Sequence, residues 1–519
     1  MGVASHAGRT ALVCLTLLLC ACTTLGPDYE EPGVDWLSDW QTDLYGQIGD
    51  QDRQSEVDLD FWWRLFDDPV LNELIDTARR ENPSLRIAGL RILESRALLG
   101  IAGSNLYPQV QQVSSAVAFA NTRQRGGATP NSEDSFTSYQ ADFNVGWELD
   151  FWGRFQRGIE SADAAFFTSI TSQWDAQVLL SAQVTDLYFA YRTTLLRIVI
   201  ARENAAVQKR SFEITQRLFK SGQNSELDLQ QARTQYLATL STIPALEVTL
   251  TQVRNGLGAL LGRAPGDLPE LAEVGGPLPA VEPLVVRDVP ARLLMRRPDI
   301  RAAAWQAAAQ SAQIGIAEAD FYPAISLFGN VGWSGNTVNG SPNTTNLAAG
   351  PSFSWNVFDY GRISNNVRVQ DARLQQAIQA FQNSVLQAAR EIDDAAISVV
   401  KSREQQAVLD EALDSARRSL ELANTRYAEG YAGFQRVLDA QRAQFAQAER
   451  ALVNQANQIS SIISFYKAIG GGWLELSLEQ MIPETERDTM QLRTDWGELM
   501  TEPLPAGVDT VPSSTETTP

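Results

Sequence analysis

The spacing of apolar residues along this chain switches from a period of two to a helical period, once in each half of the sequence. In the first half, apolar and polar residues alternate strictly from Tyr139 to Asp150, which predicts a strand with one apolar face. A similar alternation runs from Ile325 to Trp333 and from Phe353 to Val357. Each half therefore predicts a β-hairpin, at about residues 108–150 and 323–360, which makes four strands.

The segments that connect the paired strands are polar. Asn121 to Ser138 and Ser334 to Gly350 are rich in Gly, Asn, Thr and Ser, a composition typical of solvent-facing turns. We therefore expect a long exposed loop at the end of each hairpin.

A long segment without Gly or Pro follows each hairpin, from Ile159 to Ser221 and from Arg362 to Glu429. At ~1.5 Å per residue, each would form a helix of roughly 95 to 100 Å. Each segment ends at a glycine, Gly222 or Gly430, and a second helical stretch returns, so the pattern predicts two antiparallel helical hairpins. In the second half, apolar positions step by three and four as in a coiled coil: Ile378, Phe381, Val385, Ala388, Ile392, Ala395 and Val399.

The two halves are copies of one unit. Short motifs recur in the same order, such as Gly100-Ile-Ala and Gly315-Ile-Ala, or Gly153-Arg and Gly361-Arg. Agreement of Gly, Pro and Trp positions over more than about 100 residues indicates a tandem duplication.

The repeat sets the expected domain limits. An N-terminal anchor and equatorial segment (22–70) precedes the first copy (71–262, with long helices at about 155–260). A Pro-rich linker around the outside (263–296) leads to the second copy (297–473, with long helices at about 362–469). The C-terminal tail (474–519) is expected to be equatorial or disordered, and mobile from Pro483 onward.

Cysteine and histidine are confined to the start of the chain, since Cys14, Cys20, Cys22 and His6 are the only ones present. The chain beyond Cys22 therefore has no Cys/His zinc site, thiol nucleophile, disulfide or Ser-His triad. Pairs of Asp and Glu on long helices are usually solvated faces. We predict no catalytic residue, no metal site and no cofactor, and the net charge of -20 without a dense basic cluster argues against a nucleic-acid partner.

The N-terminus resembles a lipoprotein signal peptide (1–21). Arg9 precedes an apolar run, Ala11 to Leu19, that is too short to span a bilayer. Leu19-Cys-Ala-Cys22 resembles a bacterial lipobox, so Cys22 would become the mature N-terminus with an N-acyl chain and an S-diacylglycerol lipid. Thr23, rather than Asp, follows it, which favours delivery to the outer membrane. The alternative is an ordinary signal peptide with an incidental cysteine.

How the chain crosses that membrane depends on the strands, because no apolar run after Cys22 approaches the ~20 residues of a membrane helix. A closed barrel is the other solution. Four strands are fewer than the about eight of the smallest barrels, so two or three chains would have to pool their strands. The alternative is a soluble sandwich whose apolar face points inward.

Several motifs together resemble the TolC-like outer-membrane efflux proteins, and more closely the OprM/NodT-type outer-membrane lipoproteins of resistance-nodulation-division (RND) efflux systems. The motifs are Gly26-Pro-Asp-Tyr-Glu-Glu-Pro32; Trp63, Phe66 and Asp68-Pro69; Trp147-Glu-Leu-Asp-Phe-Trp-Gly-Arg154; Arg296-Arg-Pro-Asp-Ile300; Phe358-Asp-Tyr-Gly-Arg362; and Gly470-Gly-Gly-Trp473.

The resemblance implies an α+β membrane protein, a homotrimer with a shared 12-stranded outer-membrane β-barrel (four strands per chain) continued by a long periplasmic α-helical barrel. Solutes would be conducted rather than converted. The implied partners are outer-membrane lipid, a periplasmic adapter protein and an inner-membrane RND pump. The implied location is the outer membrane, lipid-anchored and extending into the periplasm.

The same resemblance implies the functional residues. The adapter would contact the tips of the helical hairpins, at Gly222, Gly430 and Tyr427. A periplasmic gate would lie at Asp439 and Arg442, whose i, i+3 spacing puts both on one helical face; the alternative is a solvated charge pair.

The gate motif departs from the family at two positions. Arg436 replaces the first carboxylate of the family's Asp-x-x-Asp form, and Gln435 stands where some relatives have an apolar residue. We therefore expect a mixed-charge constriction rather than a double acidic ring.

Two other functions fit parts of the sequence. A type I secretion duct would share the fold, although the lipobox favours the pump-associated type. A structural lipoprotein that spaces the envelope layers would need the long helices but no amphipathic strands. The sequence does not identify the exported substrates, because a wide duct need not bind them. A copper or silver pump is an alternative partner.

Overall fold

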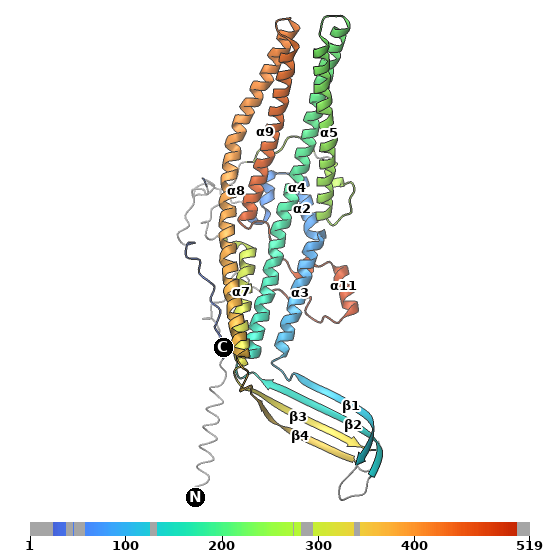
Figure 1. Cartoon of the computed structure of the whole chain (residues 1–519), viewed down its shortest axis with the longest axis vertical. Helices are drawn as coiled ribbons and strands as arrows, with labels where there is room; N and C mark the ends of the chain where they lie inside the picture. The colour runs from blue at the N-terminus through green and yellow to red at the C-terminus, as the bar shows by residue number, and fades with distance from the viewer. Residues whose placement is uncertain are drawn as a thin grey trace.

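The computed structural model describes residues 24–37, 45, 58–124, 132–272, 275–281, 294–336 and 343–505. The predicted signal peptide, Cys22 and the last part of the tail lie outside these residues. Two long helical hairpins stand side by side, a sheet extends from one end of them, and shorter helices pack around the middle (Figure 1). Within the described residues, no helix combines the length and apolarity needed to cross a membrane.

The long hairpins confirm the helical prediction. In the first copy α4 (Arg154–Lys220) returns as α5 (Glu226–Leu260), and in the second copy α8 (Arg362–Ala428) returns as α9 (Phe434–Ala468). The coiled-coil positions of α8 from Phe381 to Val399 are buried against the other helices. Both hairpins therefore run from the sheet to free tips at the far end (Figure 1).

Shorter helices precede each hairpin and surround the middle of the molecule. In chain order they are η2 (Leu59–Phe66), α2 (Pro69–Glu81), α3 (Pro83–Ser104), η3 (Pro269–Leu271), α7 (Pro298–Ala319), α10 (Leu478–Met481) and α11 (Glu484–Arg493). Four of them, α2, α3, η3 and α7, begin at a proline, whose fixed φ suits the first helical position. Asp68 and Asn82 cap α2 and α3 by accepting backbone N–H bonds.

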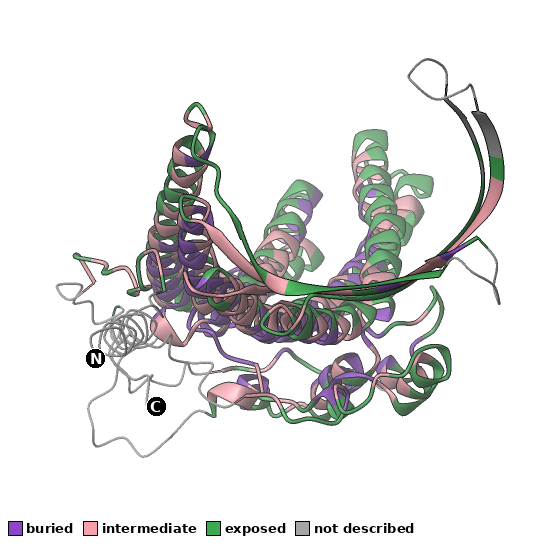
Figure 2. Ribbon diagram, turned by 90° about the horizontal axis from the view of Figure 1, so that it is seen from below, coloured by how far each residue is buried: buried purple, intermediate pink, exposed green. Residues whose placement is uncertain are grey.

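The four strands form one antiparallel sheet in the order β1-β2-β3-β4, from β1 (Val110–Gln124), β2 (Ser132–Leu149), β3 (Ala324–Gly335) and β4 (Asn343–Ser354). The sheet is curved when seen from its end of the molecule (Figure 2). One register row joins four exposed apolar side chains, Val113, Phe143, Val331 and Leu347. On the opposite face Asn330 donates to Asn144 at 2.7 Å. The amphipathic sheet is as predicted, and its apolar face is uncovered in the single chain.

The strand ends correct the sequence prediction. The loops expected at Asn121 to Ser138 and Ser334 to Gly350 are shorter, because β1 and β2 stay paired up to Gln124 and Ser132, and β3 and β4 up to Gly335 and Asn343. The ladder uses backbone groups, so polar residues extend it as well as apolar ones; Asn121 also donates to the hydroxyl of Ser135 at 2.8 Å. At its other end β4 stops at Ser354, before Trp355 and Val357.

Equivalent tryptophans fix the junction between sheet and helices in both copies. The indole N–H of Trp147 donates to the carbonyl of Leu106 at 3.1 Å, and that of Trp355 donates to the carbonyl of Phe321 at 2.9 Å. Each acceptor stands immediately before the Tyr-Pro that opens a hairpin. The duplication has thus preserved one bond at the point where helix becomes strand.

The C-terminal tail corrects another expectation. Residues 484–505 are not disordered: α11 forms there, and Met500, 1% exposed, packs in a core cluster with α3 and α4. The guanidinium of Arg96, on α3, donates to the carbonyls of Leu499, Glu502 and Pro503 at 2.8 to 2.9 Å. Contacts with α3, rather than a local pattern, order this segment, which is why its sequence shows no periodicity.

The segment 24–37, which we call the N-terminal strap, crosses both copies next to the sheet. The buried guanidinium of Arg157, on α4, donates to the carbonyls of Leu25 and Gly26 and to Asp28. Gly26 lies directly on Gly315 of α7, so that a Cβ on Gly315 would stand 2.4 Å from the carbonyl oxygen of Leu25. The strap therefore needs glycine on α7 at this crossing.

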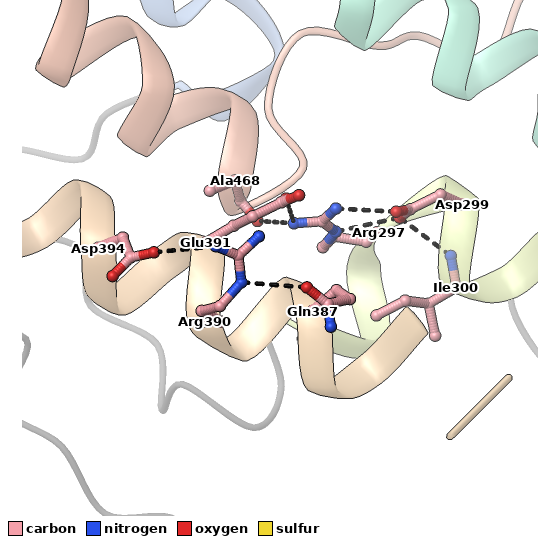
Figure 3. Close-up of polar contacts among 8 residues, drawn as sticks. All are labelled: Arg297, Asp299, Ile300, Gln387, Arg390, Glu391, Asp394 and Ala468. Atoms are coloured by element: carbon pink, nitrogen blue, oxygen red, sulfur yellow. Dashed lines mark hydrogen bonds and ion pairs between the residues drawn. The ribbon is translucent and has the colours of Figure 1, made fainter. Parts of the chain in front are cut away.

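Arg297 joins three helices through its side chain (Figure 3). Its side chain, 11% exposed, pairs with Asp299 at the start of α7 and with Glu391 on α8. It also donates to the carbonyl of Ala468, at the end of α9, at 2.9 Å. Burial alone would lower the pKa of Arg297, but the bonds to the two carboxylates raise it above its ordinary value.

Asp175 of α4 belongs to the same charged region and should make stability depend on pH. Burial, together with Asp299 and Glu391, raises the pKa of Asp175 to about 6, against the opposite effect of Arg297 and Lys467. A raised carboxyl pKa means that the native state binds the extra proton, so stability falls as pH rises from about 4 to about 6 and stays lowered above that. We expect Asp175→Asn to be more stable than the parent at neutral pH.

Urea unfolding of both proteins, followed by helical circular dichroism at several pH values, tests this prediction. The stability difference should shrink as the pH falls from about 6 to about 4 and vanish below that, where Asp175 is protonated in either state. A difference of constant size across this range would show that the substitution acts through packing instead.

Candidate functional site: the tips of the helical hairpins

Both hairpin tips close on a glycine in the left-handed region. Gly222 has φ +77° and Gly430 has φ +80°. In each turn the glycine N–H and the next N–H bond back to the preceding helix, as Gly430 does to Tyr427 and Tyr431 to Arg426. A Cβ on either glycine would meet nothing within 4 Å. The backbone, and not crowding, thus requires glycine, and both turns are open to a partner.

Tyr427 is half-buried at the tip. Its ring packs against Phe434 at 5.4 Å, and its hydroxyl accepts from the side chain of Asn224, in the first copy, at 3.2 Å. It lies at the margin of a small core shared by both tips, together with Phe212 and Ala423; the core itself consists of Ala232, Phe434, Val437 and Leu438. The sequence-based expectation of Tyr427 as an adapter contact therefore stays a prediction, with a second role as a bond between the copies.

Two other apolar side chains are more exposed at the tips, Tyr431 at 82% and Leu227 at 66%. Sequence reasoning did not single them out. Tyr431 directly follows the helix-ending Gly430, and Leu227 is the second residue of α5. An apolar residue so close to a solvent-facing turn is the signal that could have found them.

Asp439 and Arg442 do form a pair, but a loose one. Arg442 Nη1 lies 3.6 Å from Asp439 Oδ1, and both side chains are about half exposed. The shorter contacts go elsewhere: Arg442 Nε donates to Gln235 Oε1 on α5 at 2.6 Å, and Gln435 Nε2 donates to Asp439 at 2.9 Å. An exposed pair of this kind contributes about 0 to 1 kcal/mol.

The tip region thus carries three polar bonds between the two copies. They are Arg442 to Gln235, Asn224 to Tyr427, and Gln441 to Ser211 at 2.9 Å. Any movement of the second-copy hairpin away from the first must break them. No group of three or more His, Cys, Asp or Glu side chains in the described part of the chain is placed to hold a metal ion.

A long two-hairpin helical body that ends in an amphipathic sheet with an uncovered apolar face defines a channel-forming protein of a bacterial envelope. The comparisons specify the family. The outer membrane efflux protein family matches residues 74–263 and 289–471, one stretch for each copy of the repeat. The chain belongs to this family, so it is a passive outer-membrane efflux channel component and not an enzyme.

Individual relatives agree along nearly the whole chain. The solvent efflux pump outer membrane protein SrpC of Pseudomonas putida is 30% identical over 89% of this chain and 98% of its own length. The probable outer membrane lipoprotein SilC of Salmonella typhimurium is 27% identical over 88% and 97%. The solved outer-membrane channel OprN has a TM-score of 0.77 and 30% identity, and covers 87% of this chain and 100% of its own.

Proposed function

We propose that three copies of this chain form the outer-membrane duct of a tripartite efflux system, which receives small solutes from an inner-membrane RND pump through a periplasmic adapter. The observation that carries the proposal is the uncovered apolar row of the sheet, Val113, Phe143, Val331 and Leu347. It fits lipid, and twelve pooled strands would close a barrel of ordinary size. A spacer lipoprotein would have no use for such a face.

Single-channel recording in planar bilayers tests the duct. The purified assembly should conduct ions, while silence from a well-folded assembly would favour the spacer. The cargo is a matter for the pump, although the description of SrpC as a solvent efflux component favours apolar small solutes among the candidates.

The periplasmic gate is the second part of the proposal. Around a threefold axis, three Asp439 side chains would repel one another unless Arg442 offsets them. In each chain Arg442 also bonds to Gln235, so it ties the second-copy hairpin to the first. Closure would then depend on these bonds, and a mixed-charge constriction fits them better than an acidic ring.

We predict that the double variant Asp439→Ala, Arg442→Ala opens the duct. The Asp439–Arg442 pair lies within one helix, so the contact that opening must break is the bond from Arg442 to Gln235. Three such bonds worth about 0.5 kcal/mol each would shift the open–closed equilibrium about tenfold, which is read as open probability and as leakage of large antibiotics. Arg418→Ala with Glu421→Ala is the matched control, since this pair on α8 has the same i, i+3 spacing and is exposed. Equal open probability and equal leakage in the parent and both double variants would remove the gate from these residues.

The adapter would dock on the tips, where Gly222 and Gly430 leave the turns open and Leu227 and Tyr431 present apolar surface. This surface is small and surrounded by polar residues. It suits an assembly that forms through several weak contacts repeated around the axis.

The lipid anchor at Cys22 is the third part, supported by the lipobox and by the lipoprotein relative SilC. We predict that Cys22→Ser abolishes metabolic labelling with a palmitate analogue, because the serine hydroxyl offers no thiol for the diacylglycerol. Cys20→Ser, two residues earlier, is the control that should leave labelling intact. Labelling that persists in Cys22→Ser would place the processing site elsewhere.

A further inference from the structure

A groove of about 620 Å³ lies between the two copies, with walls formed by α4, α8 and α9. It is distinct from the tips, since it runs along the seam between the helical hairpins from the level of Leu196 to that of Leu420. Its volume falls within the range of small-molecule sites. The proposed conduction of solutes makes no use of it.

One end of the groove is a fixed wall made by the segment Pro277–Leu278 between the copies. The guanidinium of Arg192 donates to the carbonyl of Pro277 at 2.7 Å, and Asp68 holds that guanidinium at 2.7 Å. The side chain of Gln455, on α9, donates to the carbonyl of Leu278 at 3.3 Å. These bonds hold the wall in place without a ligand, so the groove is preformed.

The lining mixes apolar side chains with polar and charged ones. Glu203 and Asp410 are negative and Arg417 is positive, so neither sign of charge on a ligand is strongly favoured. The apolar lining comes from all three helices: Leu196, Ile200, Leu413, Leu420, Phe445 and Leu452.

Asn204 offers the groove a polar side chain, whose amide nitrogen is enclosed in this arrangement. This lining residue of α4 is 7% exposed, and its amide nitrogen has no hydrogen-bond partner among the described residues. Gln208, one turn further along α4, is 1% exposed with neither amide atom bonded in the same part of the structure. A buried donor without a partner costs about 1 to 3 kcal/mol, so an acceptor supplied to Asn204 would be bound favourably.

We propose that this groove binds a neutral, mostly apolar small molecule that carries one hydrogen-bond acceptor, and that the Asn204 side chain turns its amide nitrogen toward the groove to donate to this acceptor. Ketones, esters and ethers with an aromatic or aliphatic body have this chemistry. Because the walls belong to both copies, a bound molecule joins the two helical hairpins and stabilises their present arrangement. The site lies within one chain, so its test does not depend on the channel proposal.

The probe is prodan, a neutral naphthalene with one ketone, whose fluorescence shifts to the blue in apolar surroundings. Titration into the full-length protein in amphipol should give saturable binding. Asn204→Leu removes the amide with little change in shape, and because the amide lacks a partner, this variant should fold at least as well as the parent. It should weaken prodan binding about tenfold, equivalent to ~1.4 kcal/mol.

Two controls separate the site from non-specific partitioning. 2-(Dimethylamino)naphthalene lacks the ketone and should bind parent and Asn204→Leu equally. Leu413→Trp fills the groove and should abolish saturable binding of both probes. Leu422→Trp should not, because Leu422 lies on the same helix, is 46% exposed and does not line the groove.

Three results would overturn the proposal: no saturable binding to the parent, an equal effect of Asn204→Leu on both probes, or full binding to Leu413→Trp. If the protein did not conduct ions but bound both probes as expected, the channel proposal would be wrong and the ligand proposal would stand.

Discussion

Replacement of Arg297 by leucine should lower the free energy of unfolding by about 3 to 5 kcal/mol, the usual cost of breaking a buried ion pair from one side. The guanidinium makes four hydrogen bonds: two to Asp299, one to Glu391 and one to the carbonyl of Ala468. Leucine fills part of the space but leaves the carboxylates and the carbonyl unpaired. The variant loses the contacts of Arg297 with Asp299, Glu391 and Ala468 that Figure 3 shows.

Arg390→Leu is the matched control, because Arg390 is on α8 one residue before Glu391. Its pair with Asp394 is 3.3 Å long and both side chains are more than 60% exposed, so its loss should cost about 0 to 1 kcal/mol. Urea unfolding in detergent, followed by helical circular dichroism, measures both variants. Similar small losses of unfolding free energy in Arg297→Leu and Arg390→Leu would contradict the prediction. They would mean that water solvates the groups that Arg297 leaves unpaired.

Gly315→Ala should be the second most disruptive change, costing about 2 to 4 kcal/mol for the addition of one methyl group. That methyl would lie 2.4 Å from the carbonyl oxygen of Leu25 and 2.9 Å from a carbon of Arg157. The N-terminal strap has to move away, and the buried guanidinium of Arg157 then loses its bonds to Leu25, Gly26 and Asp28.

Gly158→Ala should have the opposite sign. This glycine is also inside a helix, next to Arg157, but a Cβ on it meets nothing within 4 Å. The substitution should therefore stabilise the protein by roughly 0.5 to 1 kcal/mol through helix propensity. The two variants together separate crowding from propensity, and protease sensitivity of the N-terminal strap in Gly315→Ala gives an independent measurement. If the N-terminal strap of Gly315→Ala resisted protease as well as that of the parent, the added methyl group would not displace the strap and the prediction would be wrong.

The helices and the sheet could be predicted from the sequence because each depends on local patterning. The period of two from Tyr139 to Asp150 and the glycines that end the long helices are properties of neighbouring residues. The limits of the strands could not be predicted as well, since backbone pairing at Asn121 continues into polar residues. Composition distinguishes strand from loop only where one face is apolar.

Contacts between distant segments are what the sequence did not reveal. The motif Gly-Ile-Ala occurs in both copies, yet Gly315 lies under the N-terminal strap while nothing would meet a Cβ on Gly100. The same two residues, Ile and Ala, follow both glycines in sequence, so this motif does not reveal which glycine the strap covers.

The candidate gate shows the same limit. Helical spacing predicted the pair of Asp439 and Arg442, and the structure places them together, but loosely. The shorter bond of Arg442, to Gln235, joins residues of different copies. No periodicity within one helix could predict it, because it depends on how the two hairpins pack.

The open sides of the sheet have a consequence for the cell. β1 and β4 are its outer strands, and among the described residues each pairs with one neighbour only. Unpaired backbone groups are solvated in water but cost several kcal/mol each in hydrocarbon. A lone chain is thereby kept out of the bilayer, and entry becomes a step that several chains take together. Under the proposed assembly, the number of finished ducts should then rise more steeply than the supply of chains.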